Sequence, residues 1–160
     1  SMFTAIFRGL WLTLKHSWKS RETVQYPEQK ESMPIGYRGL HKLLRWEDGL
    51  ERCVGCKLCS AACPVDCIHV ESEENESSSP VSKGERYASV YEINELRCIF
   101  CGYCEEACPV GAIVLSNEYE FCADDRSKFL YEKEDFLVKR NEDYPELKNR
   151  YPEEKLLTYL

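Results

Sequence analysis

Two runs of four cysteines constrain this 160-residue chain more than any other feature of its sequence. Each run reads C-x2-C-x2-C-x3-C-P; the first holds Cys53, Cys56, Cys59 and Cys63, and the second holds Cys98, Cys101, Cys104 and Cys108. The surrounding segments, Arg52 to Val70 and Arg97 to Leu115, align without a gap when residue numbers are shifted by 45. Two copies are too few for a solenoid, so the repeat predicts a single domain with pseudo-twofold symmetry.

The spacing of each run is that of bacterial two-cluster ferredoxins, in which the fourth cysteine of a run ligates the other cluster. A [4Fe–4S] cluster has four irons, and each requires a soft, deprotonated thiolate. The segment Ser60 to Cys63 favours a helical turn that Pro64 ends, and such a turn carries the fourth cysteine across. We therefore expect two [4Fe–4S] clusters, one held by Cys53, Cys56, Cys59 and Cys108 and the other by Cys63, Cys98, Cys101 and Cys104.

Other uses of the cysteines fit the pattern less well. A structural zinc site shows separated C-x2-C pairs rather than runs of four. Disulfides are disfavoured because we expect no secretory signal. Clusters with a purely structural role remain an alternative. Cys67 aligns with Ala112 and Cys122 lies outside both runs, so both are expected to be structural. The sequence has no phosphate-binding loop or nucleophile motif, which favours electron transfer over substrate chemistry.

The N-terminal segment differs from the rest of an acidic chain of net charge −7. Apolar residues recur there at helical spacing: Phe3, Ile6, Phe7, Leu10, Trp11, Leu14 and Trp18. All charges before Glu22 are basic, which predicts an amphipathic helix on a membrane surface or a partner. Packing on its own domain is the alternative. No apolar run is long enough to predict a transmembrane helix, and the acidic balance argues against nucleic acid as a partner.

These features predict an α+β fold, a two-cluster bacterial ferredoxin-like domain with an N-terminal amphipathic helix and extended terminal arms. Residues 71–85 are expected to form a solvated loop, 87–93 a strand and 124–140 a polar helix. The YPE triplets at 26–28, 144–146 and 151–153 predict extended arms. The domain boundaries follow as 1–22 for the helix, 23–50 for an arm, 51–116 for the 2×[4Fe–4S] domain, and 117–160 for a C-terminal helix and tail.

Beyond the cysteines, the sequence resembles subunit I of the proton-pumping NADH:quinone oxidoreductase, respiratory complex I. The segments RETVQYPE (21–28), YRG (37–39) and LYEKEDFL (130–137) carry this resemblance together with both runs. It implies an electron relay without a substrate site of its own, passing electrons from a large cluster-bearing subunit to the terminal-cluster subunit at the quinone site. It also implies that the N-terminal helix lies against the membrane arm, beside the quinone-channel subunit. The expected location is peripheral, on the cytoplasmic face of a bacterial inner membrane, or on the matrix face in an organelle.

Three other functions share the same cysteine pattern. A diffusible two-cluster ferredoxin would have no need of the basic helix or the long arms. A relay subunit of a related membrane-bound hydrogenase is disfavoured by RETVQYPE and LYEKEDFL. A non-redox scaffold would carry clusters that a strong reductant leaves unchanged.

Overall fold

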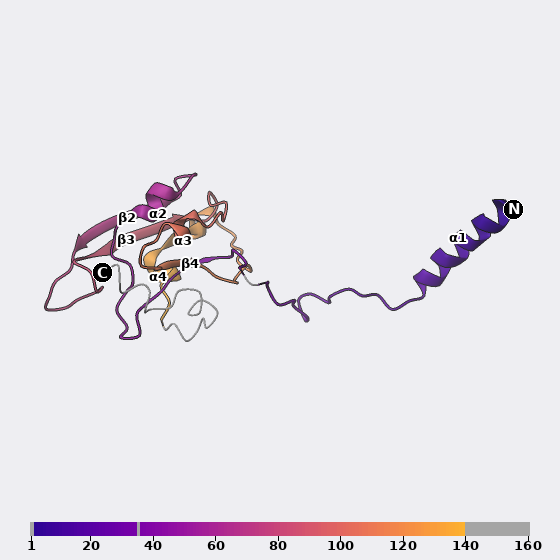
Figure 1. Cartoon of the computed structure of the whole chain (residues 1–160), viewed down its shortest axis with the longest axis horizontal. Coiled ribbons are helices and arrows are strands. Elements are labelled where there is room, and N and C mark those ends of the chain that lie inside the picture. The colour runs from indigo at the N-terminus through magenta and orange to yellow at the C-terminus, as the bar shows by residue number, and fades with distance from the viewer. Residues whose placement is uncertain (1, 35, 140–160) are drawn as a thin grey trace. The chain divides into compact units, whose positions relative to one another are not determined.

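The computed structural model describes residues 2–34 and 36–139 (Figure 1). The chain divides into an N-terminal unit that ends at Met33 and a second unit that begins at Pro34. Among the described residues, no helix has the length and apolar content needed to cross a bilayer.

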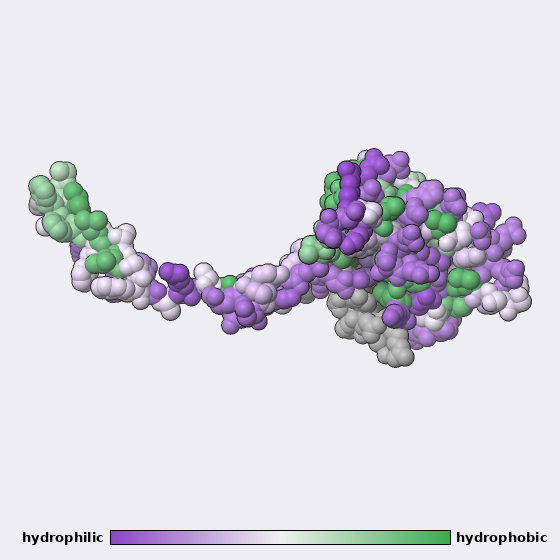
Figure 2. Space-filling view, turned by 180° about the vertical axis from the view of Figure 1, so that it is seen from behind, coloured by the Kyte–Doolittle hydropathy of each residue, from purple (hydrophilic) through white to green (hydrophobic). Residues whose placement is uncertain are grey.

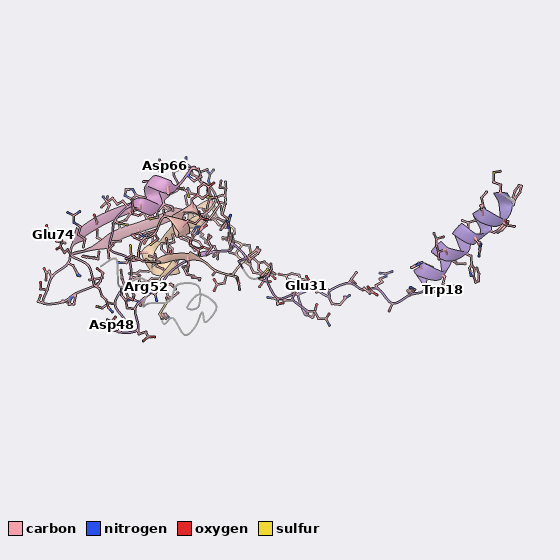
Figure 3. The ribbon with its side chains drawn as sticks, viewed as in Figure 1. Trp18, Glu31, Asp48, Arg52, Asp66 and Glu74 are labelled. Atoms are coloured by element: carbon pink, nitrogen blue, oxygen red, sulfur yellow. The ribbon has the colours of Figure 1, made fainter. Side chains whose placement is uncertain are left out.

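The N-terminal unit contains one helix, α1 (Met2–Ser17), as the apolar spacing predicts. No residue of α1 is buried, and its large apolar side chains are mostly exposed. Figure 2 shows these hydrophobic residues gathered along the helix. Trp18, labelled in Figure 3, follows the last turn and is 82% exposed. Residues 19–34 form no helix or strand, but the YPE triplet at 26–28 lies in a turn, closed by the Gln29 N–H donating to the Gln25 carbonyl at 2.7 Å, and is not extended. The predicted arm at 23–50 also reaches too far, because it includes β1 (His41–Leu43), a strand of the second unit.

The second unit is built from two copies of a strand, cysteine loop, short helix and strand. The first copy contains β1 (His41–Leu43), α2 (Leu58–Ala62) and β2 (Ile68–Glu74). The second contains β3 (Arg86–Asn94), α3 (Tyr103–Glu106) and β4 (Ile113–Leu115). β1 pairs antiparallel with β4, and β2 pairs antiparallel with β3 (Figure 1). Because each copy supplies one strand to each pair, neither copy can form its sheet without the other.

The core lies between the two strand pairs and includes the cysteine loops. Its largest fully buried apolar side chains include Leu43, Tyr91, Ile93, Ile113 and Phe136. These pack in one cluster with four buried cysteines, Cys53, Cys59, Cys67 and Cys104. The predicted turn before Pro64 is confirmed, since α2 ends at Ala62 and Cys63 is extended with φ −74° and ψ 115°.

Two further local predictions need correction. Residues 124–139 do not form one helix but a 3₁₀ turn, η1 (Arg126–Phe129), a strand, β5 (Leu130–Glu132), and one helical turn, α4 (Lys133–Phe136). β5 pairs with the free edge of β3, and these backbone hydrogen bonds outweigh the local helical preference. Arg140 and the YPE triplets at 144–146 and 151–153 lie outside the described residues.

The predicted loop at 71–85 is shorter than expected, because Glu71–Glu74 continue β2 past a register shift between Glu71 and Ser72. The rest of the loop is held by Asn75. Its side-chain amide donates to the carbonyls of Ser82 and Gly84, at 2.6 and 2.9 Å, and its carbonyl accepts from the Val81 N–H at 2.9 Å. The strand predicted at 87–93 is confirmed within β3.

Candidate iron–sulfur centres

Each cysteine loop bends through three left-handed backbone positions, and the three are equivalent in the two copies. The pairs are Gly55 (φ 64°) with Phe100 (51°), Lys57 (64°) with Gly102 (85°), and Asp66 (49°) with Gly111 (54°). Asp66 is labelled in Figure 3, in the turn after α2. A residue with a Cβ loses about 1–2 kcal/mol in this region. Since one member of every pair is not glycine, the fold imposes the conformation regardless of the side chain.

Four cysteines of the first predicted site face one cavity. These are Cys53, Cys56 and Cys59 from the first run and Cys108 from the second. The other lining side chains are chiefly apolar, including Leu43, Val70, Val110 and Ile113. The structure thus brings a cysteine of the second run to the three first-run thiols.

The thiols of this cavity perturb one another. Burial raises the pKa of Cys53 to about 12, and the charges of Cys108, Cys59 and Cys56 add to this effect. A hydrogen bond from the Gly55 backbone opposes it. Burial likewise raises the pKa of Cys59 to about 11. Without a metal these thiols keep their protons at neutral pH, so binding of a soft cation that requires thiolates would displace protons.

At the second predicted site, Cys63 and Cys98 both interact with Cys67, and Cys98 and Cys104 both interact with His41. The Sγ atoms of Cys63 and Cys67 are 3.4 Å apart, and Cys98 also interacts with Cys67. The remaining predicted ligand, Cys101, is partly buried two residues before α3. Burial raises the pKa of Cys67 well above its ordinary value, and its neighbours Cys63 and Cys98 add to the effect.

Backbone N–H groups point at cysteine sulfurs in both sites. The N–H of Cys67 donates to Cys63 Sγ at 3.5 Å, and the N–H of Ala112, its equivalent in the repeat, donates to Cys108 Sγ at 3.2 Å. The N–H of Phe100 donates to Cys98 Sγ at 3.3 Å. Burial acts to raise the pKa of Cys63, but such backbone donors outweigh it and the pKa is lowered. Donors aimed at sulfur, soft thiol ligands and an apolar cavity fit [4Fe–4S] clusters.

A buried pair of ionisable side chains adjoins the second site. His41 Nδ1 lies 2.9 Å from Glu95 Oε1, and His41 Nε2 lies 4.0 Å from Cys98 Sγ. Burial lowers the pKa of His41, but hydrogen bonds with Cys104, Cys98 and Glu95 outweigh it and raise the pKa to about 12. Glu95 Oε2 has no hydrogen-bond partner among the described residues, so the carboxylate depends on His41.

Comparison with known proteins supports [4Fe–4S] clusters in this chain. Residues 52–112 match the family described as the 4Fe-4S dicluster domain. The chain is 52% identical over 134 residues to NADH-quinone oxidoreductase subunit 9 of Thermus thermophilus, covering 84% of this chain and 74% of that protein. It has the same identity and coverage with NADH-quinone oxidoreductase subunit I from a second strain of the same species. The chain belongs to the family of NADH-quinone oxidoreductase subunit I.

Membership of the subunit I family confirms the predicted electron-transfer role in this oxidoreductase, and the dicluster match confirms the prediction of two [4Fe–4S] clusters. A solved structure of a membrane-bound sulfane sulfur reductase, an archaeal respiratory membrane complex, shares the fold with a TM-score of 0.56. That match has 23% identity and covers 88% of this chain and 68% of the other, so it supports the architecture alone.

Several residues that surround the cysteines could not be predicted from the sequence. His41, Glu95 and Tyr91 lie outside both runs, and no motif marks them. Strand pairing places His41 and Tyr91, and Glu95 directly follows β3. Cys67 is buried, as a structural residue should be, but its thiol also contacts Cys63, which its alignment with Ala112 gave no reason to expect. Cys122, which was also expected to be structural, is exposed.

Proposed function

We propose that this chain is a fixed electron relay of NADH-quinone oxidoreductase, with its clusters held crosswise between the two cysteine runs. The first ligand set is Cys53, Cys56, Cys59 and Cys108, and the second is Cys63, Cys98, Cys101 and Cys104. The observation that carries this proposal is the shared cavity in which Cys108 faces three cysteines of the first run. The clusters supply one-electron transfer when bound.

The protein's own groups prepare both sites for this role. Apolar side chains around the first site limit the access of water, and backbone N–H groups aimed at sulfur stabilise the thiolate form. Crosswise ligation also ties the two copies of the repeat together, in addition to the strand pairs. It keeps the two centres within one small domain, as electron transfer between them requires.

Pairwise cysteine substitutions test the crosswise ligation. Cys59→Ser and Cys108→Ser should perturb the same electron paramagnetic resonance signal, although they lie in different runs. Cys104→Ser and Cys63→Ser should perturb the other signal. If Cys63→Ser instead alters the signal that Cys59→Ser alters, each run ligates its own cluster and the crosswise assignment is wrong.

The proposed place of the relay is on the peripheral side of the complex, at the membrane surface. We propose that it takes electrons from the large cluster-bearing subunit and delivers them to the terminal-cluster subunit beside the quinone site. The exposed helix α1 supports a docking role, since its apolar side chains and flanking cations match a membrane surface and the quinone-channel subunit. This helix also favours a fixed relay over a diffusible ferredoxin. The face of the membrane would be cytoplasmic in a bacterium and the matrix side in an organelle.

A further inference from the structure

His41 and Tyr91 occupy equivalent positions in the two halves of the fold. His41 on β1 is paired with Leu115 on β4, and Tyr91 on β3 is paired with Val70 on β2. Leu115 and Val70 are themselves equivalent, because they end the two aligned copies of the repeat. The equivalence of His41 with Tyr91 is therefore set by strand register, and the different number of residues between each strand and its cysteine run conceals it in the sequence.

Tyr91 contacts the third cysteine of the first run. Its Oη lies 3.0 Å from Cys59 Sγ, and the side chain is buried, with 1% of the residue exposed. A cysteine that ligates iron has no proton on sulfur. The hydroxyl must then be the donor in this hydrogen bond. The ring is held edge-on by Phe136, with centroids 5.5 Å apart.

His41 contacts a cysteine of the second run. Its Nε2 lies 4.0 Å from Cys98 Sγ. Cys104, which is equivalent to Cys59, also interacts with His41. Glu95 holds Nδ1 at 2.9 Å, and the ring stacks on Phe100 with centroids 5.7 Å apart. These two contacts fix the ring so that Nε2 faces the thiols. A lone pair on Nε2 would repel a thiolate, whereas an N–H attracts it.

We propose that Tyr91 and His41 are matched hydrogen-bond donors, one for each cluster, and that each raises the reduction potential of its own cluster. The inference rests on the crosswise ligand sets proposed above. Reduction adds negative charge to a cluster and its sulfurs, and a donor to a ligating sulfur stabilises that charge. Glu95 is a positioning residue, since it acts on the second site by orienting the His41 ring.

The donors are tested by redox titration of the full chain carrying both clusters, followed by electron paramagnetic resonance. Tyr91→Phe removes one hydroxyl and keeps the ring. His41→Phe combined with Glu95→Leu removes the second donor without leaving a buried carboxylate unpaired. Each variant should lower the potential of a different cluster, and the unaffected cluster of each serves as the control for the other. At a fixed potential, the ratio of reduced to oxidised cluster should fall roughly tenfold. This change corresponds to a reduction potential about 59 mV lower for a one-electron couple.

His41→Gln is the second variant for this site, because its amide keeps an N–H donor. It should retain most of the wild-type potential, and a fall as large as that of the double variant would overturn the donor role. Unchanged potentials in Tyr91→Phe and the double variant, or equal shifts of both clusters in each, would also overturn it. Measurement of iron and sulfide content separates this result from failure of the proposed function. A wild-type chain that holds no clusters contradicts the relay function. Loaded clusters whose potentials do not change in the variants contradict only the donor roles of Tyr91 and His41.

Discussion

Gly55 provides a sharp test of how the first cysteine loop is held. Its backbone is left-handed, with φ 64°, and an added Cβ would lie 2.7 Å from Ser72 Cβ and 2.9 Å from the carbonyl oxygen of Tyr87. Both contacts are to β2 and β3, which cannot move without disturbing their pairing. Gly55→Ala therefore combines backbone strain with a steric clash.

Gly49 is the matched control. Its φ is 88°, and an added Cβ there meets no atom within 4 Å. Gly49→Ala should cost about 1–2 kcal/mol for the left-handed backbone, reduced by the lower entropy of the unfolded chain. Gly55→Ala carries the same strain plus about 1–3 kcal/mol for overpacking. The difference between the variants isolates the clash.

The assay is thermal unfolding of the cluster-loaded chain, followed by circular dichroism and cluster absorbance at one fixed scan rate. For a domain of this size, about 2 kcal/mol corresponds to a shift of roughly 10 °C. Gly55→Ala should therefore unfold roughly 10 °C below Gly49→Ala, or fail to retain the first cluster. Equal unfolding temperatures with full cluster content in both variants would refute the close packing of this loop against β2 and β3.

Three further predictions concern the helix, the metal and the core. Leu10→Glu, on the stripe of α1 formed by its apolar residues at helical spacing, should release the chain from the proposed membrane-bound complex in sedimentation assays. Leu12→Glu, a similarly exposed leucine off that stripe (58% against 60%), should not, and equal retention of both would contradict docking through the stripe. Removal of iron by a chelator under reducing conditions should abolish cooperative unfolding. The reason is that the core is built around the cysteine ligands, so metal binding supplies folding free energy. A native-like melt of the apo-protein would disprove this. Phe136→Ala should cost about 3–5 kcal/mol in chemical denaturation, since Phe136 is 1% exposed and packs on Tyr91, while Phe3→Ala on the exposed helix should cost little. Equal losses in these two variants would contradict the buried position of Phe136.

The sequence alone determined the chemistry of the sites. Ligand type and spacing are local properties, so the runs predicted two [4Fe–4S] clusters, and Pro64 predicted the end of α2. Periodicity of apolar residues identified α1 for the same reason. Local preference failed at residues 124–139, where pairing of β5 with β3 replaced the expected helix by a strand between two short turns.

The tertiary structure alone decided what surrounds the cysteines. Tyr91 reaches Cys59 across 32 residues of sequence, and His41 reaches Cys98 across 57. No spacing rule covers such distances, because the neighbours of a side chain are set by the register between strands of different copies. Glu95, the residue after β3, contacts His41 across 54 residues, and the packing of the two copies brings Cys108 to the first run. Sequence thus supplies the thiols, while the pairing of the two halves supplies the hydrogen-bond donors around them.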